Sequence, residues 1–149
     1  MKSLVRVLLF AVMLSLGVLL TACGGSTANP TANPSATGPA PMTVTVTLTD
    51  FKIASPVTQF KVGTTYHFVV INQGKTEHEL MIAPPMTAGM TMEQIDDAQL
   101  FEASDIEVGA TKTVDYTFKQ SDLKGTWEFA CHEPGHYEAG MKLPVTIVA

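Results

Sequence analysis

The residues best suited to chemistry lie in one segment near the C-terminus. Cys131, His136 and Met141 follow the spacing Cys-x4-His-x4-Met, and a loop that joins two strands can fold such side chains around one point. A second histidine, His78, stands at the start of another expected strand. One thiolate, two imidazoles and a distant thioether suit a trigonal His₂Cys copper centre with a weak axial methionine.

This donor set favours copper over zinc. Cu(I) prefers soft sulfur and Cu(II) prefers nitrogen, so a site fixed between these preferences changes little when an electron is transferred. Zinc is the nearest chemical alternative, but structural zinc takes four cysteine or histidine ligands, and here the fourth candidate is a thioether. The sequence also lacks three other metal motifs: the second histidine of the zinc-protease helix, a cysteine partner near Cys131 for a binuclear copper centre, and the Cys-x-x-Cys-His of haem attachment.

Several short strands must position these residues. Alternating or continuous apolar residues predict strands over residues 42–48, 66–71, 111–118, 126–131 and 145–148. One helix is expected at 91–101, where Thr91 and Gln94 can form a capping box. Many short strands with turns between them are typical of an all-β, Greek-key β-sandwich of about 100 residues, here with one short helical insertion.

Residues 42–149 resemble a cupredoxin, a type 1 blue copper protein of the plastocyanin/azurin superfamily. The resemblance rests on the loop from Cys131 to Met141, which is most similar to that of auracyanin-type members, and on the separate segment from Asn72 to His78. It implies a cupredoxin-like fold and one mononuclear type 1 copper per chain. By the family pattern the ligands are His78, Cys131 and His136, with Met141 axial, and Asn72 ties the two ligand loops together by hydrogen bonds.

The first 22 residues are expected to be a lipoprotein signal peptide. A positively charged start and an almost unbroken apolar run precede Leu20-Thr21-Ala22-Cys23, which resembles the lipobox of bacterial lipoproteins. A retained transmembrane anchor is the alternative, but the 16 residues from 7 to 22 are fewer than the ~20 that span a bilayer comfortably. We therefore expect an extracytoplasmic protein, lipid-anchored through Cys23 to a bacterial membrane on its periplasmic or cell-surface side.

Residues 23–41 are expected to be the lipidated cysteine and a flexible linker. After Cys23 the segment contains only Gly, Ser, Thr, Ala, Asn and Pro, including a tandem Thr-Ala-Asn-Pro. Such a segment has no large apolar side chain whose burial could offset the entropy of ordering. The folded domain is therefore expected to occupy residues 42–149.

The chain without residues 1–22 is acidic, with 7 lysines against 14 acidic residues and a formal charge of −7. This balance argues against nucleic-acid binding, which needs clustered cations. Four carboxylates lie close in sequence to the two candidate histidine ligands: Glu77, Glu79, Glu133 and Glu138. A local negative field speeds encounter with a cationic partner, so we expect a redox protein with a basic docking patch to bind a monomer of this chain.

The favoured function is a membrane-tethered carrier that shuttles single electrons between redox partners through Cu(I) and Cu(II). Four protein ligands leave no open position for a substrate, so we expect no enzymatic activity. The alternative is a periplasmic or extracellular copper chaperone or copper-resistance protein.

Two further groups of residues are open to interpretation. His132 follows Cys131 directly, so its side chain should project to the opposite face, and we expect it at the surface. Four methionines are expected to pack the helix against the sandwich or to line an apolar docking surface, with a second Cu(I) site as the alternative: Met81, Met86, Met90 and Met92.

Overall fold

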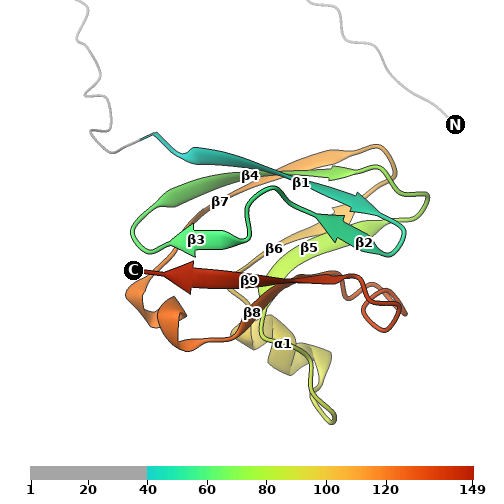
Figure 1. Ribbon diagram of the computed structural model, residues 1–149. Coiled ribbons are helices and arrows are strands. Elements are labelled where there is room, and N and C mark those ends of the chain that lie inside the picture. Colours follow the sequence, from blue (N-terminus) through green and yellow to red (C-terminus); the bar gives the residue numbers. More distant parts are fainter. Residues whose placement is uncertain (1–39) are drawn as a thin grey trace, which may run out of the picture. The chain divides into compact units, whose positions relative to one another are not determined.

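The computed structural model describes residues 40–149. The expected signal peptide at 1–22, the lipidation site Cys23 and nearly all of the linker lie outside these residues. Two mixed sheets face each other and form a cupredoxin-like β-sandwich with one short helix, which confirms the fold class expected from the sequence (Figure 1). No helix in the described part of the chain is long and apolar enough to cross a membrane.

The first sheet has four strands in the order β2-β1-β4-β7. Its strands are β1 (Met42–Thr49), β2 (Lys52–Ala54), β4 (Thr65–Asn72) and β7 (Thr111–Thr117). In β1 the residues Val44, Val46 and Leu48 are fully buried while the threonines between them are more exposed. This period-two alternation places one face of the strand on the core and the other towards water.

The second sheet has five strands in the order β3-β9-β8-β5-β6. Its strands are β3 (Gln59–Lys61), β5 (His78–Ala83), β6 (Phe101–Ile106), β8 (Trp127–Ala130) and β9 (Lys142–Val148). Strand β5 is antiparallel to β8, with Met81 opposite Ala130. The first residue of β5 and the last residue of β8 therefore lie at the same end of the sheet.

An aromatic cluster fills the space between the sheets. The ring of Phe60 stacks on Phe118 at 4.9 Å between centroids and meets Phe68 and Phe129 edge-on at 5.5 and 5.8 Å. These four phenylalanines come from different segments of the chain and are all at most 1% exposed. Their burial joins the two sheets into one hydrophobic core.

The helix is shorter than the sequence suggested. It runs over α1 (Met92–Ala98), and the predicted capping box between Thr91 and Gln94 is present. Its end is set by Gln99, which is extended, and Phe101 begins β6 instead of closing the helix. Only Ile95 of α1 is buried, against the outer face of β5.

Three strands were not predicted, namely β2, β3 and β6. The first two have only three residues each, too few to show an alternating pattern. β6 pairs with β5 through a register shift between His78 and Leu80, and Asp105 near its end has a positive φ of 48°. Such a bulge disturbs the period of two on which strand prediction depends.

Candidate metal centre

Three ligand atoms converge at one end of the sandwich. The Nδ1 atoms of His78 and His136 are 3.1 Å apart, and the Sγ atom of Cys131 lies 3.9 Å from the first and 3.4 Å from the second. All three side chains are buried, with exposures of 0% for His78 and Cys131 and 9% for His136. Two imidazole nitrogens and a sulfur around one point are the donor set predicted from the sequence.

The sheet brings these residues together from two distant segments. His78 is the first residue of β5, and Cys131 directly follows the last residue of β8, the strand next to it. The loop then folds back, because the backbone N–H of Met141 donates to the carbonyl of His136 at 3.0 Å. The N–H of Cys131 donates in turn to the carbonyl of Met141 at 3.2 Å, which closes the loop.

Met141 lies where the loop meets β9. It is fully buried and belongs to the same hydrophobic cluster as Cys131. The backbone bonds from Met141 to His136 and from Cys131 to Met141 hold it beside both predicted ligands. This placement is consistent with a type 1 copper site, and the axial role of its thioether stays a prediction.

Burial shifts the pKa of two predicted ligands, Cys131 and His78. It raises the pKa of the Cys131 thiol to about 11, because a thiolate is poorly solvated inside the protein. It also lowers the pKa of His78, as does the neighbouring His136 to a smaller extent. The His78 ring is therefore neutral at pH 7 and has a nitrogen lone pair to offer a metal.

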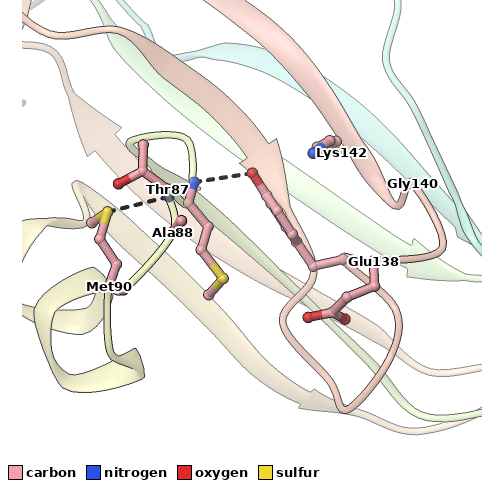
Figure 2. A pocket seen from close by; sticks show the side chains of 9 residues that line it. Thr87, Ala88, Met90, Glu138, Gly140 and Lys142 are labelled. Carbon is pink, nitrogen blue, oxygen red and sulfur yellow. Dashed lines mark hydrogen bonds between the residues drawn. The ribbon is translucent and has the colours of Figure 1, made fainter.

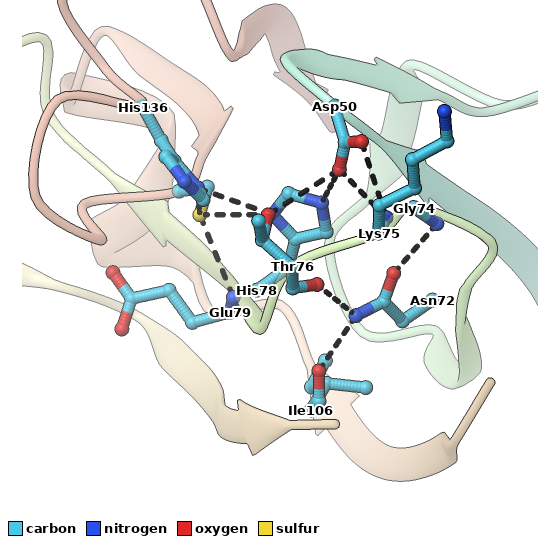
Figure 3. A network of polar contacts seen from close by, with 10 residues as sticks. Asp50, Asn72, Gly74, Lys75, Thr76, His78, Glu79, Ile106 and His136 are labelled. Atoms are coloured by element: carbon cyan, nitrogen blue, oxygen red, sulfur yellow. Dashed lines mark hydrogen bonds and ion pairs between the residues drawn. The ribbon is translucent and has the colours of Figure 1, made fainter. Parts of the chain in front are cut away.

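Asn72 has a different role from the one the family resemblance implied. Its side chain is fully buried and donates to the carbonyls of Thr76 and Ile106 at 2.8 and 2.7 Å, while its oxygen accepts from Gly74 N–H at 2.8 Å (Figure 3). These bonds hold the segment before His78 against the end of β6. They do not reach the loop from 131 to 141, so the expected tie between the two ligand loops is corrected.

Glu79 makes that tie instead, and the sequence analysis missed this role. Its backbone N–H donates to Cys131 Sγ at 3.5 Å, and its carboxylate accepts from the backbone N–H of His132 at 2.6 Å. Partial burial raises the pKa of Glu79 to about 7. Its position directly after His78 was the available signal, because the neighbour of a ligand in an antiparallel sheet can reach across to the next strand.

His132 is also not the open surface histidine that was expected. Its ring stacks on Tyr137 at 4.5 Å between centroids with an interplanar angle of 12°. Both ring nitrogens are buried and have no hydrogen-bond partner among the described residues. The prediction failed because it considered only the alternation along β8 and not the loop, which folds Tyr137 back over this face.

Three of the four methionines belong to one apolar cluster beside α1, and Met92 lies outside it. Met81 is buried in a small cluster with Ile95 of α1, and Met86 and Met90 pack against that cluster, which matches the expected packing role. Met92 is 41% exposed. Met86 and Met90 also line an open groove of about 420 Å³ beside Tyr137, where the Tyr137 hydroxyl accepts from Met86 N–H at 3.0 Å (Figure 2).

The donor set fits a copper ion better than the zinc alternative. One sulfur and two imidazole nitrogens face one another, and the nearest further sulfur-bearing residue in the loop, Met141, carries a thioether. Zinc sites of the structural kind need a fourth cysteine or histidine, and the described residues place none with this group. Together with the sandwich, this cluster defines a copper protein of the cupredoxin type.

The chain belongs to the plastocyanin/azurin family of copper binding proteins, whose family model matches residues 40–148. It is similar to the copper-resistant cuproprotein CopI of Rubrivivax gelatinosus, with 31% identity over 118 residues that cover 75% of this chain and 70% of that protein.

Solved structures share the fold at low sequence identity. An auracyanin from Roseiflexus castenholzii has a TM-score of 0.56 at 20% identity, covering 74% of this chain and 100% of that one. Auracyanin B has a TM-score of 0.57 at 19% identity, covering 75% and 93%. An azurin from Methylomonas sp. strain J has a TM-score of 0.52 at 15% identity, covering 74% and 100%.

Proposed function

We propose that this protein is a one-electron carrier with a mononuclear type 1 copper held by His78, Cys131 and His136, with Met141 as a weak axial ligand. The observation that carries the proposal is the convergence of one sulfur and two Nδ1 atoms within 3.9 Å of one another in a buried cluster. Copper bound there would supply a one-electron Cu(I)/Cu(II) couple.

The chain's own contribution is to keep the donors fixed. The ligands come from a sheet end and a hydrogen-bonded loop, so their positions are set by the fold before any metal arrives. His136 is the least buried of the three ligands, and the edge of its ring meets Phe51, which is 47% exposed, at 5.1 Å between centroids. Electrons would therefore enter and leave through the short path from His136 to this exposed surface.

The deciding experiment is a pair of spectra on the copper-loaded protein. A carrier of this kind should show an intense visible sulfur-to-copper absorption and a type 1 paramagnetic-resonance signal, with one copper per chain. Both signals should vanish on reduction and return in full after repeated reoxidation. A colourless Cu(II) form would contradict the proposed site.

A copper-resistance or chaperone role is the second candidate, because the similar protein from Rubrivivax gelatinosus is described as a copper-resistant cuproprotein. The two roles differ in what happens to the reduced protein. A carrier should keep Cu(I) in the presence of a competing Cu(I) chelator through many redox cycles. A chaperone should lose its copper to the chelator upon the first reduction.

We also propose that the carrier works outside the cytoplasm, tethered by lipid at Cys23, and docks on a basic redox partner. The pKa of Glu77 is raised, first by its own partial burial and then by three nearby acids, Glu107, Glu133 and Asp105, which shows that these carboxylates lie close together. Asp105 and Glu107 thus add to the acidic residues that the sequence placed near the histidines. Glu79 contributes less negative charge than expected, because burial raises the pKa of its carboxyl to about 7.

The docking proposal is tested with a cationic redox protein at rising ionic strength. The second-order rate should fall steeply for the native protein, because a field of this kind is screened within about 8–10 Å. The fall should flatten when Glu77, Glu107 and Glu133 become Gln. The matched control removes three exposed acids of α1, Glu93, Asp96 and Asp97. A rate indifferent to salt would mean that docking is apolar.

A further inference from the structure

A carboxylate from outside the ligand segments lies against the far side of the His78 ring. Asp50, in the turn between β1 and β2, places its Oδ1 atom 3.2 Å from His78 Nε2 (Figure 3). The His78 side chain is fully buried, while that of Asp50 is 28% exposed. One nitrogen of the ring therefore faces the metal centre, and the other faces a charged group near the surface.

The contact determines which nitrogen of His78 carries the proton. An ionised carboxylate can only accept hydrogen bonds, so Nε2 must be the donor. A neutral imidazole with its proton on Nε2 has its lone pair on Nδ1. Nδ1 is the atom that faces His136 at 3.1 Å and Cys131 Sγ at 3.9 Å.

Asp50 is itself held in place by the segment before His78. Its two carboxylate oxygens accept from Lys75 N–H at 2.9 and 3.1 Å, and Oδ1 also accepts from the Thr76 hydroxyl at 3.3 Å. Gly74 makes this approach possible, because a Cβ there would lie 2.5 Å from Asp50 Oδ1 and 2.6 Å from His78 Nε2. The carboxylate and the ring thus meet in a space that only glycine leaves open.

We propose that Asp50 is a positioning residue of the metal centre, which orients His78 for Nδ1 ligation and places a negative charge one ring away from the metal. The inference rests on the proposed copper function and deepens it. A carboxylate behind a ligating histidine fixes the tautomer and makes the ring a stronger donor. The added negative charge stabilises Cu(II) more than Cu(I), so Asp50 lowers the reduction potential.

The experiment compares Asp50→Asn and Asp50→Ala with the matched variants Asp97→Asn and Asp97→Ala, on an exposed aspartate of α1. Cu(II) and Cu(I) affinities are titrated separately for each protein. Asp50→Asn, which keeps the shape and removes the charge, should weaken Cu(II) binding about tenfold and leave Cu(I) binding nearly unchanged. A tenfold fall in the ratio of Cu(II) affinity to Cu(I) affinity corresponds to a reduction potential about 59 mV higher for a one-electron couple.

A second readout needs no metal. Long-range proton–nitrogen spectra of the metal-free protein at pH 8 should show a single Nε2–H tautomer for His78, and a mixture of tautomers in Asp50→Ala. Gly74→Ala, whose new Cβ would separate the carboxylate from the ring, should shift the tautomers and the affinity ratio in the same direction.

Two results would overturn the assignment. One is an Nδ1–H tautomer for His78 in the native metal-free protein. The other is a Cu(II)/Cu(I) affinity ratio in Asp50→Asn equal to that in Asp97→Asn. Neither measurement requires reversible electron transfer. A native protein that does not cycle reversibly between Cu(I) and Cu(II) would refute the carrier function, and the tautomer and the affinity ratio would still decide the role of Asp50.

Discussion

Two regions of the sandwich are buried: the aromatic core around Phe60, and the end that holds His78, Cys131 and His136, here called the metal end. Different forces stabilise each region. The rings around Phe60 pack among other apolar side chains, and their contacts are dispersion and hydrophobic burial. The metal end buries His78, Asn72 and Cys131, and each of these has a directed polar contact. The first region supplies stability, and the second supplies a fixed geometry.

This difference teaches where each region is sensitive to mutation. Removing atoms from the core costs free energy roughly in proportion to the lost contacts, while the chemistry of the site is untouched. Removing one polar atom at the metal end changes little volume but leaves a buried partner without its bond. Mutations in the core should therefore change the free energy of unfolding, and mutations at the metal end should change the spectrum or potential of bound copper.

The largest expected effect is that of Cys131→Ser. The thiolate is the only soft anionic ligand in the cluster, so its replacement should abolish the visible absorption completely while the sandwich stays folded. His132→Gln, at the next position, is the control and should keep the colour. An undiminished blue spectrum in Cys131→Ser would refute the proposed site, and a global loss of fold would erase the contrast between the regions.

The next effect is that of Phe60→Ala in the core. Loss of a fully buried ring that touches three other phenylalanines should lower the free energy of unfolding by about 3–5 kcal/mol, measured by denaturant titration of the metal-free protein. Phe51→Ala is the matched control at the metal end, where the ring is 47% exposed and its loss should change stability far less. Equal losses for the two variants would contradict the division of roles.

The smallest expected effect is that of Met141→Leu. The substitution conserves volume in a fully buried position, so the protein should fold and still bind copper. The apolar replacement favours the less charged Cu(I) state, so the reduction potential measured by voltammetry should rise. Met86→Leu, in the groove beside Tyr137, should leave the potential unchanged. Failure of Met141→Leu to bind copper at all would show that the thioether is a main ligand.

Three long strands were predictable from local pattern, because β1 and β7 alternate with a period of two and β4 is a continuous aromatic and β-branched run. The structure has these three within one residue of the expected bounds, whereas β9, expected at 145–148, begins at Lys142. β2 and β3 gave no such signal because three residues are too few. Phe101 was assigned to the helix, but it belongs to β6 and pairs with Ile82 of β5. Local spacing along the chain cannot reveal a partner on another strand.

The cluster of candidate ligands was predictable for a chemical reason. Few residue types bind copper, and Cys131, His136 and Met141 follow one another at a spacing that a single loop can close. His78 could be added because it opens a strand. The surroundings were not predictable from local pattern. Glu79 reaches Cys131 from the neighbouring strand β5, and Asp50 reaches His78 from the turn between β1 and β2 in the other sheet.

The sequence by itself thus determined the β-sandwich class, the donor types and the acidic charge of the chain, since these depend on local periodicity and on residue chemistry. Only the tertiary structure decided that Asn72 ties the segment before His78 to the end of β6, that Tyr137 covers His132, and that Asp50 lies behind His78. The physical reason is that a hydrogen bond or a ring contact forms only when the two groups lie within a few ångströms of each other. Residues 28 positions apart, such as Asp50 and His78, come that close only when the sheets have packed.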